Sequence, residues 1–479
     1  MTADYIAFHA TQCPTAVAAL YAGREITYAE MNRSLRSIMR SLRELDLPQG
    51  SRVAVAFNDS YIHLLLLLAF ERLGIATASL QQVNVARALP TLSRFDLIVT
   101  DPQPPIAGAR RHLALTQDRL RSLLTRPDSG EPESMRPSDG LPARLLHTSG
   151  TTAAPKWFEI SRRAQEGMMH EWALHFAFTS RSRTLLTLPF NVRAVYEFVS
   201  TCLRARGAVV FDDPKQWTRL LTPARITHTI FLPVVLARLL EELPADFAKP
   251  SDLTILCFGA HLSPALRERA MRRLATGICD LYGTIEVGSI STSWNIGDGG
   301  FGAICPRAVV EALDESGMSV TPGTPGRIRL KTDYMTDGYL DDPETTRRMF
   351  RDGWFYPGDI GTLDGRGSLR ILGRGDDMLN IGGVKYLPSV LEELIRAAVP
   401  VNDVGVCSLP REDGVEELWI GVAAPLLDGS ELAERIVTVL RAHGLEGVQV
   451  KKLDGVPRNA NGKIQRNLLK EIVARAARR

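Results

Sequence analysis

A run of small and hydroxyl-bearing residues constrains this chain more than any other feature. The run His147-Thr148-Ser149-Gly150-Thr151-Thr152-Ala153-Ala154-Pro155-Lys156 follows Leu145-Leu146, where we expect a short buried strand to end. Small residues let backbone N–H groups approach a polyphosphate, hydroxyls add donors, and a lysine adds positive charge. A Walker loop is excluded because Pro155-Lys156 stands where Gly-Lys-Ser/Thr is needed. The run predicts a phosphate-binding loop, with a Ser/Thr-rich surface turn as the alternative.

Length and charge limit the classes of protein to consider. At 479 residues the chain exceeds one ordinary hydrophobic core, so we expect two or more domains. Its 45% hydrophobic and 23% charged residues are typical of soluble globular proteins. The net charge of +3 gives no overall electrostatic case for nucleic acid or an anionic membrane as a partner.

The cysteines and the N-terminal residues predict a reduced, cytoplasmic protein. The six cysteines lie far apart with no CxxC pair, which argues against a disulfide framework and against a zinc site. Residues 1–5 lack the basic region and apolar run of a signal peptide. The most apolar run, Leu64–Phe70, is too short to span a bilayer and predicts a buried helix. We therefore expect a cytoplasmic location and no membrane span.

The periodicity of apolar residues predicts an α/β fold. Helical spacing over Thr27–Arg43 precedes an apolar strand at Val53–Phe57, and this alternation continues to about residue 292. Such alternation predicts largely parallel sheets covered by helices. From about 303 to 372, short segments separated by turns predict an antiparallel sheet or a distorted barrel. Gly373–Asp377 is predicted to be a linker to a small separate domain of helices and strands.

Two segments combine an aromatic ring with carboxylates in a pattern that suits a nucleotide. In Leu281-Tyr282-Gly283-Thr284-Ile285-Glu286, the tyrosine offers a flat face for a base and Gly283 permits close approach. Glu286 suits Mg²⁺, which prefers oxygen ligands and shares them with phosphates. Asp359 ends a second segment, Trp354–Asp359, at a turn from which a carboxylate can hold a ribose diol. The alternatives are an ordinary aromatic-glycine turn and a solvent-facing aspartate.

Two later segments combine glycines with cations. In Gly373–Lys385, glycines that tolerate unusual dihedral angles stand beside Arg374, whose guanidinium can make forked hydrogen bonds to hydroxyls or phosphate. Pro457–Arg466 is a polar loop with Lys463 at its tip, immediately before a predicted C-terminal helix. A lysine on a mobile loop can be brought to a site where negative charge builds up. The alternatives are a flexible linker with a β-turn and a solvated surface lysine.

In this order and at these separations, the segments resemble the motifs of the acyl-adenylate-forming superfamily: acyl- and aryl-CoA ligases, adenylation domains of peptide synthetases, and luciferases. The likeness runs from Ile26-Thr27-Tyr28 to Lys463. It implies a large N-terminal AMP-binding domain over residues 1–373, with parallel-sheet α/β subdomains and a small β-barrel-like subdomain. It also implies a smaller, mobile α+β lid over residues 374–479.

The resemblance implies roles for individual residues of the N-terminal domain. The residues that resemble the loop around the β- and γ-phosphates of ATP are Thr148, Ser149, Gly150, Thr151, Thr152 and Lys156. Gly259-Ala260-His261 is similar to a segment that lies along the adenine. Tyr282, followed by Gly283 and Thr284, resembles the ring stacked on that adenine, and Glu286 resembles the Mg²⁺ ligand.

The remaining roles fall at the domain boundary and on the lid. Asp359 and Arg374 resemble the pair that binds the ribose hydroxyls, and Asp376 stands at the hinge position. Lys463 is similar to the catalytic lysine of the adenylating step. Lys385 lies in a segment that, in the superfamily, enters the site for the second half-reaction.

The implied activity is ATP-dependent conversion of a small-molecule carboxylic acid to an acyl-AMP, followed by thioester formation with CoA. ATP, Mg²⁺ and CoA are the implied cofactors. In an alternative, the acyl group is loaded onto the phosphopantetheine of a carrier protein in trans, since no Gly-Gly-x-Ser-type attachment site follows residue 470. A third interpretation, a non-catalytic nucleotide-binding relative, is opposed by Lys463, Glu286, Asp359 and Arg374 together.

Some positions depart from the superfamily pattern. Ala153 and Trp157 stand where glycine is usual or frequent, and Ile285 stands where threonine commonly precedes the Mg²⁺ ligand. We expect Trp157 to pack away from phosphate, and one hydroxyl contact to phosphate to be missing at Ile285 unless Thr284 substitutes. Lys385 replaces a common arginine, so forked phosphate binding becomes a point charge.

The resemblance also implies which residues line the acid-binding pocket. They are Leu188–Tyr196, Phe231-Leu232-Pro233 and the residues beside Tyr282. No acidic residue precedes Glu197 where an α-ammonium group would be paired, which disfavours an α-amino acid. The aromatic and aliphatic lining suits an aryl or fatty acid. Arg193 could pair with a second carboxylate of a substrate, with a solvent-facing arginine as the alternative.

Overall fold

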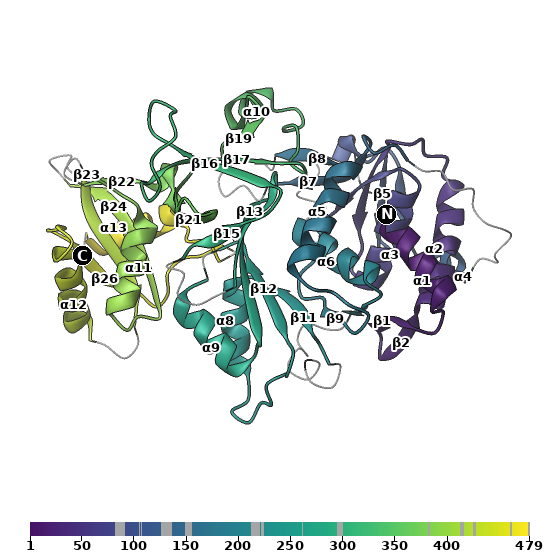
Figure 1. Ribbon diagram of the computed structural model, residues 1–479, viewed down its shortest axis with the longest axis horizontal. Coiled ribbons are helices and arrows are strands. Elements are labelled where there is room, and N and C mark those ends of the chain that lie inside the picture. Colours follow the sequence, from purple (N-terminus) through teal and green to yellow (C-terminus); the bar gives the residue numbers. More distant parts are fainter. Residues whose placement is uncertain are drawn as a thin grey trace.

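A computed structural model gives the architecture of most of the chain. The structure describes residues 1–81, 92–104, 106, 108–125, 137–148, 156–211, 221, 225–260, 262–294, 300–381, 384–411, 416–424, 428–459 and 462–477. Figure 1 shows helices and sheets in succession, with the N-terminal elements at one end and the last helices and strands at the other.

A six-stranded sheet forms the first layer of the N-terminal part. Its strands are β3 (Arg52–Ala56), β4 (Ala76–Ser79), β5 (Leu97–Thr100), β6 (His112–Ala114), β7 (Pro142–His147) and β8 (Trp157–Ser161), in the order β6-β5-β3-β4-β7-β8. All pairs are parallel except β7–β8. The helices in this part are α2 (Tyr28–Arg43), α3 (Ser60–Arg72), α4 (Gln117–Thr125) and α5 (Arg162–His175).

The prediction of a buried helix at Leu64–Phe70 is confirmed. Helix α3 begins after Asp59, whose carboxylate accepts a hydrogen bond from the Ile62 N–H at 3.0 Å. Such N-caps satisfy a donor that the helix itself leaves unpaired. Every residue of Leu64–Phe70 is buried, which agrees with a core helix. Among the described residues, no helix is both long and apolar enough to cross a membrane.

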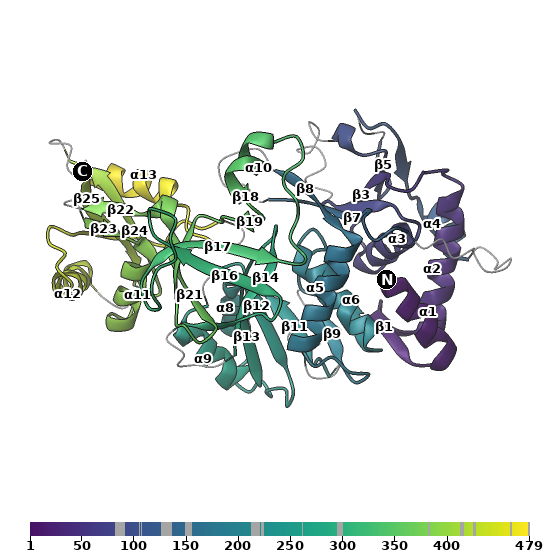
Figure 2. The same cartoon turned by 45° about the horizontal axis from the view of Figure 1, so that its top comes forward.

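The largest sheet joins a parallel region to an antiparallel one. The parallel region and its edge hairpin contain β1 (Val17–Tyr21), β2 (Arg24–Thr27), β9 (Arg183–Leu185), β10 (Ala208–Phe211), β11 (His228–Phe231), β12 (Thr254–Phe258) and β13 (Gly277–Thr284). The helices packed around it are α1 (Thr2–Gln12), α6 (Arg193–Arg204), α8 (Pro233–Glu242) and α9 (Pro264–Arg273). Helices α8 and α9 contribute to a hydrophobic cluster on one face, and α5 and α6 to a cluster on the other. Figure 2 shows these elements from a second direction.

The predicted change to short antiparallel strands is confirmed, but it begins at β14 (Gly288–Ser293), earlier than the predicted start at about residue 303. The strands of the antiparallel region are β14, β15 (Gly302–Ile304), β16 (Ala308–Leu313), β17 (Gly326–Thr332), β18 (Phe350–Arg351), β19 (Trp354–Phe355), β20 (Asp359–Leu363) and β21 (Ser368–Arg374). Helix α10 (Pro343–Met349) lies between β17 and β18 in the chain. The prediction of a linker over Gly373–Asp377 is wrong at its start. Pairing with β20 extends β21 to Arg374, and Gly375–Asp377 forms a 3₁₀ turn.

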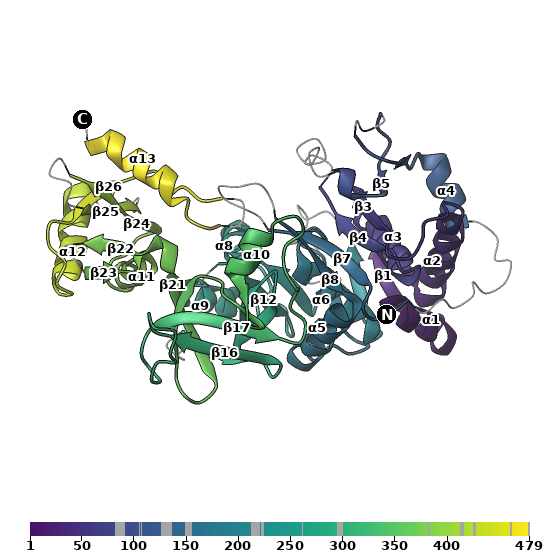
Figure 3. The same ribbon diagram turned by 90° about the horizontal axis from the view of Figure 1, so that it is seen from above.

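The C-terminal elements have a hydrophobic cluster of their own. They are β22 (Leu379–Ile381), β23 (Val384–Tyr386), α11 (Pro388–Ala398), β24 (Asp403–Pro410), β25 (Glu416–Ala423), α12 (Gly429–Arg441), β26 (Gln449–Lys452) and α13 (Arg466–Ala477). The main cluster draws only on residues 379–450. These elements stay grouped at one end in every view (Figures 1, 2 and 3). The α/β fold class is therefore confirmed, while a domain boundary between 373 and 374 stays a prediction.

Candidate nucleotide site

Three of the predicted ribose and base residues lie in direct contact. The Tyr282 hydroxyl donates to Asp359 Oδ2 at 2.5 Å, and Arg374 Nη1 donates to Asp359 Oδ1 at 3.3 Å. Asp359 is 7% exposed, so the alternative of a solvent-facing turn aspartate is wrong. The structure thus brings Tyr282 and Arg374 to the buried Asp359 carboxylate, from which they lie 77 and 15 positions away in the sequence.

Local backbone geometry explains this arrangement. Gly358 has φ +82°, which a residue with a side chain rarely adopts, and the turn it makes leads directly into β20. A Cβ at Gly358 would lie 3.3 Å from Arg374 Nη2. Asp359 and Arg374 are directly opposite each other in the β20–β21 ladder, so strand register fixes the pair. Arg374 also lies 3.7 Å from Asp376 in the 3₁₀ turn that follows.

Burial, and next the negative charge of Asp359, raise the pKa of the Tyr282 hydroxyl well above its ordinary value. The hydroxyl therefore stays protonated and acts as a donor. The charge of Glu286, which stands two positions after the end of the strand that carries Tyr282, contributes in the same direction. The candidate site therefore includes the Tyr282–Asp359–Arg374 cluster and, just beyond the end of β13, Glu286.

Glu286 lies in a capped turn after β13. The Thr284 hydroxyl oxygen accepts from the Val287 N–H at 3.2 Å, which ties the turn to the strand end. The Glu286 side chain is buried, and its Oε1 accepts a hydrogen bond from the Tyr339 hydroxyl at 2.8 Å. Burial first, and the charge of Glu286 next, raise the pKa of Tyr339, so this hydroxyl also stays a donor.

Lys156 is brought to the same place by residues that the sequence analysis missed. Its Nζ donates to Thr345 Oγ1 at 2.6 Å, lies 3.3 Å from Asp342 Oδ2 and sits 5.6 Å from the centre of the Tyr339 ring. Tyr339 therefore joins Lys156 to Glu286. The Asp342-Pro343 step signals a helix start, but nothing in the sequence connects α10 to the predicted phosphate loop.

The two flanks of the phosphate loop are adjacent. The Thr148 N–H donates to the Lys156 carbonyl at 3.0 Å, and Thr148 Oγ1 accepts from the Lys156 N–H at 3.3 Å. Trp157 is buried in a hydrophobic cluster, while its separation from phosphate stays a prediction. The predicted phosphate-binding residues Ser149, Gly150, Thr151 and Thr152, together with Ala153, lie outside the described residues.

Two predicted glycines are required by neighbouring protein atoms. A Cβ at Gly283 would lie 2.3 Å from the Gly288 carbonyl oxygen, so the close approach here is to the backbone of β14. Gly259 has φ +86°, and a Cβ there would lie 3.0 Å from a methyl group of Leu232. Ala260 follows at the end of β12, and His261 lies outside the described residues.

The loop that carries Lys463 approaches the large sheet near this glycine. A Cβ at Gly462 would lie 3.1 Å from the Val234 side chain, at the start of α8. Leu232, which contacts Gly259, stands two positions before Val234. The Lys463 side chain is exposed, and its N–H donates to Asn459 Oδ1 at 3.0 Å. Figure 3 shows the chain before α13 running toward α8.

Lys385 lies elsewhere on the C-terminal part. Its Nζ lies 3.1 Å from Glu315 Oε1 in the turn between β16 and β17, and both side chains are largely exposed. The structure therefore brings Lys463, but not Lys385, toward the start of α8. Lys385 is on the β22–β23 hairpin and is held against the antiparallel region instead.

Arg193 differs from both sequence interpretations. It is only 7% exposed, so the solvent-facing alternative is wrong. Its Nε donates to Glu197 at 2.9 Å, Nη1 to the Ile285 carbonyl at 2.8 Å, and Nη2 to the Tyr334 carbonyl at 3.3 Å. All three nitrogens have protein partners, which leaves this guanidinium little capacity for a second substrate carboxylate. It instead links α6 to the turn that carries Glu286.

The donor set at this site fits a magnesium-bound nucleotide. Glu286 offers a carboxylate, the ligand type that Mg²⁺ prefers, beside Lys156 and its phosphate-loop flank. Asp359 offers carboxylate oxygens to hydroxyls, and half-exposed Arg374 can reach a ligand while it pairs with Asp359. The arrangement combines a cation-binding carboxylate, positive charge and a hydroxyl-binding pair within one region.

Comparisons with known proteins find relatives that match nearly the whole length of the chain. The sequence model described as "AMP-binding enzyme" matches residues 6–340. The chain is similar to the indoleacetate–CoA ligase of Aromatoleum aromaticum, with 24% identity over 98% of each chain. It is 26% identical to a 2-succinylbenzoate–CoA ligase of Listeria monocytogenes, over 96% of this chain and 97% of the other. The solved structure of ATP-bound MatB from Rhodopseudomonas palustris superposes with a TM-score of 0.84 at 25% identity, covering 98% of this chain and 99% of the other.

Proposed function

The chain belongs to the AMP-binding enzyme family, and we propose that it is an AMP-forming acid–thiol ligase that joins a carboxylic acid to CoA. Relatives named as CoA ligases match nearly the full length of both chains, which supports the thioester product. The observation that carries the proposal is the cluster around Asp359, in which Tyr282 and Arg374 converge beside Glu286.

The proposed reaction has two steps. In the first, a carboxylate oxygen of the acid attacks the α-phosphorus of ATP, and the bond from that phosphorus to pyrophosphate breaks. In the second, the CoA sulfur attacks the acyl carbon, AMP leaves, and the thiol proton is released. Both steps develop negative charge that fixed donors can stabilise more strongly than they stabilise the reactants.

The residues around Asp359 hold the nucleotide in this proposal. Asp359 and Arg374 bind the ribose hydroxyls, and Tyr282 lies against the adenine while its hydroxyl fixes Asp359. Gly259-Ala260 borders the base, with His261 as a further proposed contact. Because these groups already contact one another, little reorganisation is needed when ATP arrives.

Charge at the phosphates is balanced from two directions. Lys156, with Thr148 at the other flank of the loop, is proposed to bind the β- and γ-phosphates, and it would exchange its contact with Asp342 for them. Mg²⁺, held by Glu286, would supply Lewis-acid stabilisation of the departing pyrophosphate. Lys463 is proposed to stabilise the charge at the α-phosphorus and the attacking carboxylate.

We infer an aryl or aliphatic monocarboxylic acid as the substrate class. Leu188, Val192 and Ile285 are partly buried and pack against the main core, which gives the predicted pocket apolar walls. Arg193 is engaged by protein acceptors, so a second carboxylate finds no matched cation there. The named CoA ligases among the relatives favour CoA over a carrier protein as the acceptor.

Exchange of labelled pyrophosphate into ATP, measured with a panel of carboxylic acids, tests the first step. We expect exchange with an aryl or fatty monoacid, none without acid, and much less with dicarboxylic or α-amino acids. Adding CoA to the competent acid should give the thioester and AMP. Transfer only to a phosphopantetheinylated carrier would replace CoA as the acceptor, and no exchange with any acid would contradict ligase activity altogether.

A further inference from the structure

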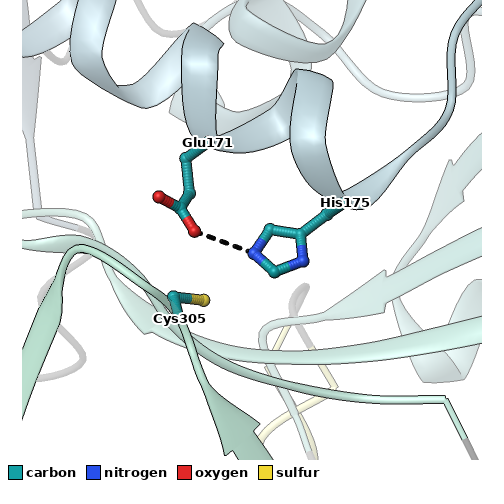
Figure 4. Close-up of side chains that lie close together, drawn as sticks. All are labelled: Glu171, His175 and Cys305. Carbon is teal, nitrogen blue, oxygen red and sulfur yellow. Dashed lines mark hydrogen bonds and ion pairs between the residues drawn. The ribbon is translucent and has the colours of Figure 1, made fainter.

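A compact group of side chains of metal-ligand type lies between α5 and the chain after β15. Glu171 and His175 stand one turn apart on α5, and Cys305 follows β15. One ligand atom from each residue lies within 4.8 Å of the other two. In Figure 4, Glu171 and His175 face each other from the helix, with the Cys305 sulfur beside them.

The Glu171 carboxylate is placed as a ligand whose second oxygen is unused. Its side chain is fully buried, and Oε1 pairs with His175 Nε2 at 2.8 Å. The other oxygen, Oε2, is buried with no hydrogen-bond partner. Leaving a buried charged acceptor unsatisfied costs several times more than an ordinary hydrogen bond contributes. The pairing with His175 therefore satisfies only one of the two carboxylate oxygens of Glu171.

Cys305 is fixed close to the pair by its backbone. Its N–H donates to the Ile290 carbonyl at 2.8 Å, and its own carbonyl accepts from the Ala308 N–H at 2.9 Å. The thiol is 1% exposed. Because the N–H and the carbonyl of Cys305 are both hydrogen-bonded, the sulfur can move only by rotation about the Cα–Cβ bond.

We propose that Glu171, His175 and Cys305 bind one divalent transition-metal ion of the zinc type. Carboxylate, imidazole and thiolate are the ligands that tetrahedral Zn²⁺ uses, whereas Mg²⁺ and Ca²⁺ avoid sulfur. Ligand atoms at zinc bond lengths stand about 3.3–3.8 Å apart in a tetrahedron, so modest side-chain rotation closes the present spacing.

The charge balance of the group suits a buried ion. Binding releases the Cys305 thiol proton to solvent, takes the lone pair of a neutral His175 and uses the existing Glu171 carboxylate. Two negative ligands then neutralise the ion, so no net charge is buried. His175 is 17% exposed, which leaves a side from which water can supply the fourth ligand.

Such an ion would connect two layers of the fold. Helix α5 packs on β7 and β8 of the six-stranded sheet, whereas Cys305 is bonded to Ile290 in the largest sheet. The spacing of the cysteines argues against a zinc site held by pairs of cysteines, but it does not test a site with one cysteine ligand. A single cysteine that joins a Glu-x-x-x-His pair more than a hundred positions earlier is not visible from that spacing.

Cobalt substitution tests the site in the tag-free, full-length protein. Co²⁺ titrated into metal-free protein should bind at one ion per chain and give the thiolate-to-cobalt charge-transfer band in the near ultraviolet. Cys305→Ser should remove that band, and His175→Gln should weaken binding at least about tenfold, since metal-site residues typically contribute that much or more. Cys407→Ser and His443→Gln, which alter a buried cysteine and an exposed histidine elsewhere, should bind as the unaltered protein does.

The change in Tm on adding Zn²⁺ is a second measurement, which also applies to variants that fold poorly. Zn²⁺ at saturation should raise Tm of the unaltered protein by about 2 °C or more and leave Tm of His175→Gln unchanged. Loss of both effects in the two site variants, with both controls intact, supports the proposal. Absence of the charge-transfer band in the unaltered protein, or its persistence in Cys305→Ser, overturns it.

Discussion

The Tyr282–Asp359–Arg374 cluster on the large sheet and the loop that carries Lys463 before α13 differ in how their functional side chains are held. Asp359 is 7% exposed and is held by donors from two other strands, whereas Lys463 is exposed on a loop. Groups that must bind ATP in a fixed geometry profit from such preorganisation. A group that acts only while charge develops needs access rather than rigidity. The difference predicts that the cluster controls binding and the loop controls rate.

Glu286→Gln should have the largest effect. The amide keeps the shape and an acceptor for Tyr339 but lacks the negative charge needed for Mg²⁺. We expect acid-dependent pyrophosphate exchange to fall about a hundredfold or more. Glu241→Gln, at an exposed position on α8, is the matched control and should exchange normally. Exchange by Glu286→Gln at an unaltered rate and unaltered Mg²⁺ dependence would refute its assignment as the metal ligand.

Asp359→Asn should weaken ATP binding and also the fold. The amide cannot balance Arg374, so we expect the ATP Kd to rise about tenfold and stability to fall by roughly 1–3 kcal/mol. Calorimetric titration with ATP and thermal unfolding measure the two quantities. Asp337→Asn, an exposed change in the same antiparallel region, should alter neither. Unchanged ATP affinity in Asp359→Asn would contradict a nucleotide-binding role for the cluster.

Asp376→Pro separates the two half-reactions. Within its 3₁₀ turn, Gly375 and Met378 donate backbone hydrogen bonds, and a proline at position 376 removes neither of them. If the C-terminal part rotates here between steps, the fixed φ of proline should slow thioester formation about tenfold and spare acyl-AMP formation. Asp376→Ala, which loses the same carboxylate without stiffening the backbone, is the control. Equal slowing of both steps would remove the hinge interpretation.

Lys385→Ala should have the smallest effect on stability. Its partner Glu315 is also exposed, and surface pairs contribute about 0–1 kcal/mol. Glu315→Ala should give the same small shift in Tm. If Lys385 also serves the second step, only Lys385→Ala will raise the KM for CoA. If the two variants have identical kinetics, the surface ion pair with Glu315 is the only role of Lys385.

The sequence predicts well those features that local patterns encode. The helix predicted over Thr27–Arg43 is observed at Tyr28–Arg43 with Thr27 as its N-cap, and the strand predicted at Val53–Phe57 is observed at Arg52–Ala56. Each depends on periodicity or on capping within a few residues. The family motifs add Asp359 and Arg374, which strand register then brings together.

Contacts between distant segments could not be predicted in this way. The burial of Arg193 depends on carbonyls at Ile285 and Tyr334, and the partners of Lys156 lie on α10. The grouping of Cys305 with Glu171 and His175 likewise depends on how two sheets pack. Such side chains lack a periodic or sequential signal because their partners are set by tertiary packing.

The rate of acyl-adenylate formation by Lys463→Ala, at saturating ATP and acid, tests the central claim most directly. We predict a rate at least about a hundredfold below that of the unaltered enzyme, because one aimed cation is missing from the transition state. ATP affinity and Tm should be unchanged, since the side chain is exposed in the free protein. Lys451→Ala, at an exposed position on β26, should form the adenylate normally. An unaltered rate in Lys463→Ala would contradict the proposal that a lysine from the C-terminal part completes a site on the large sheet.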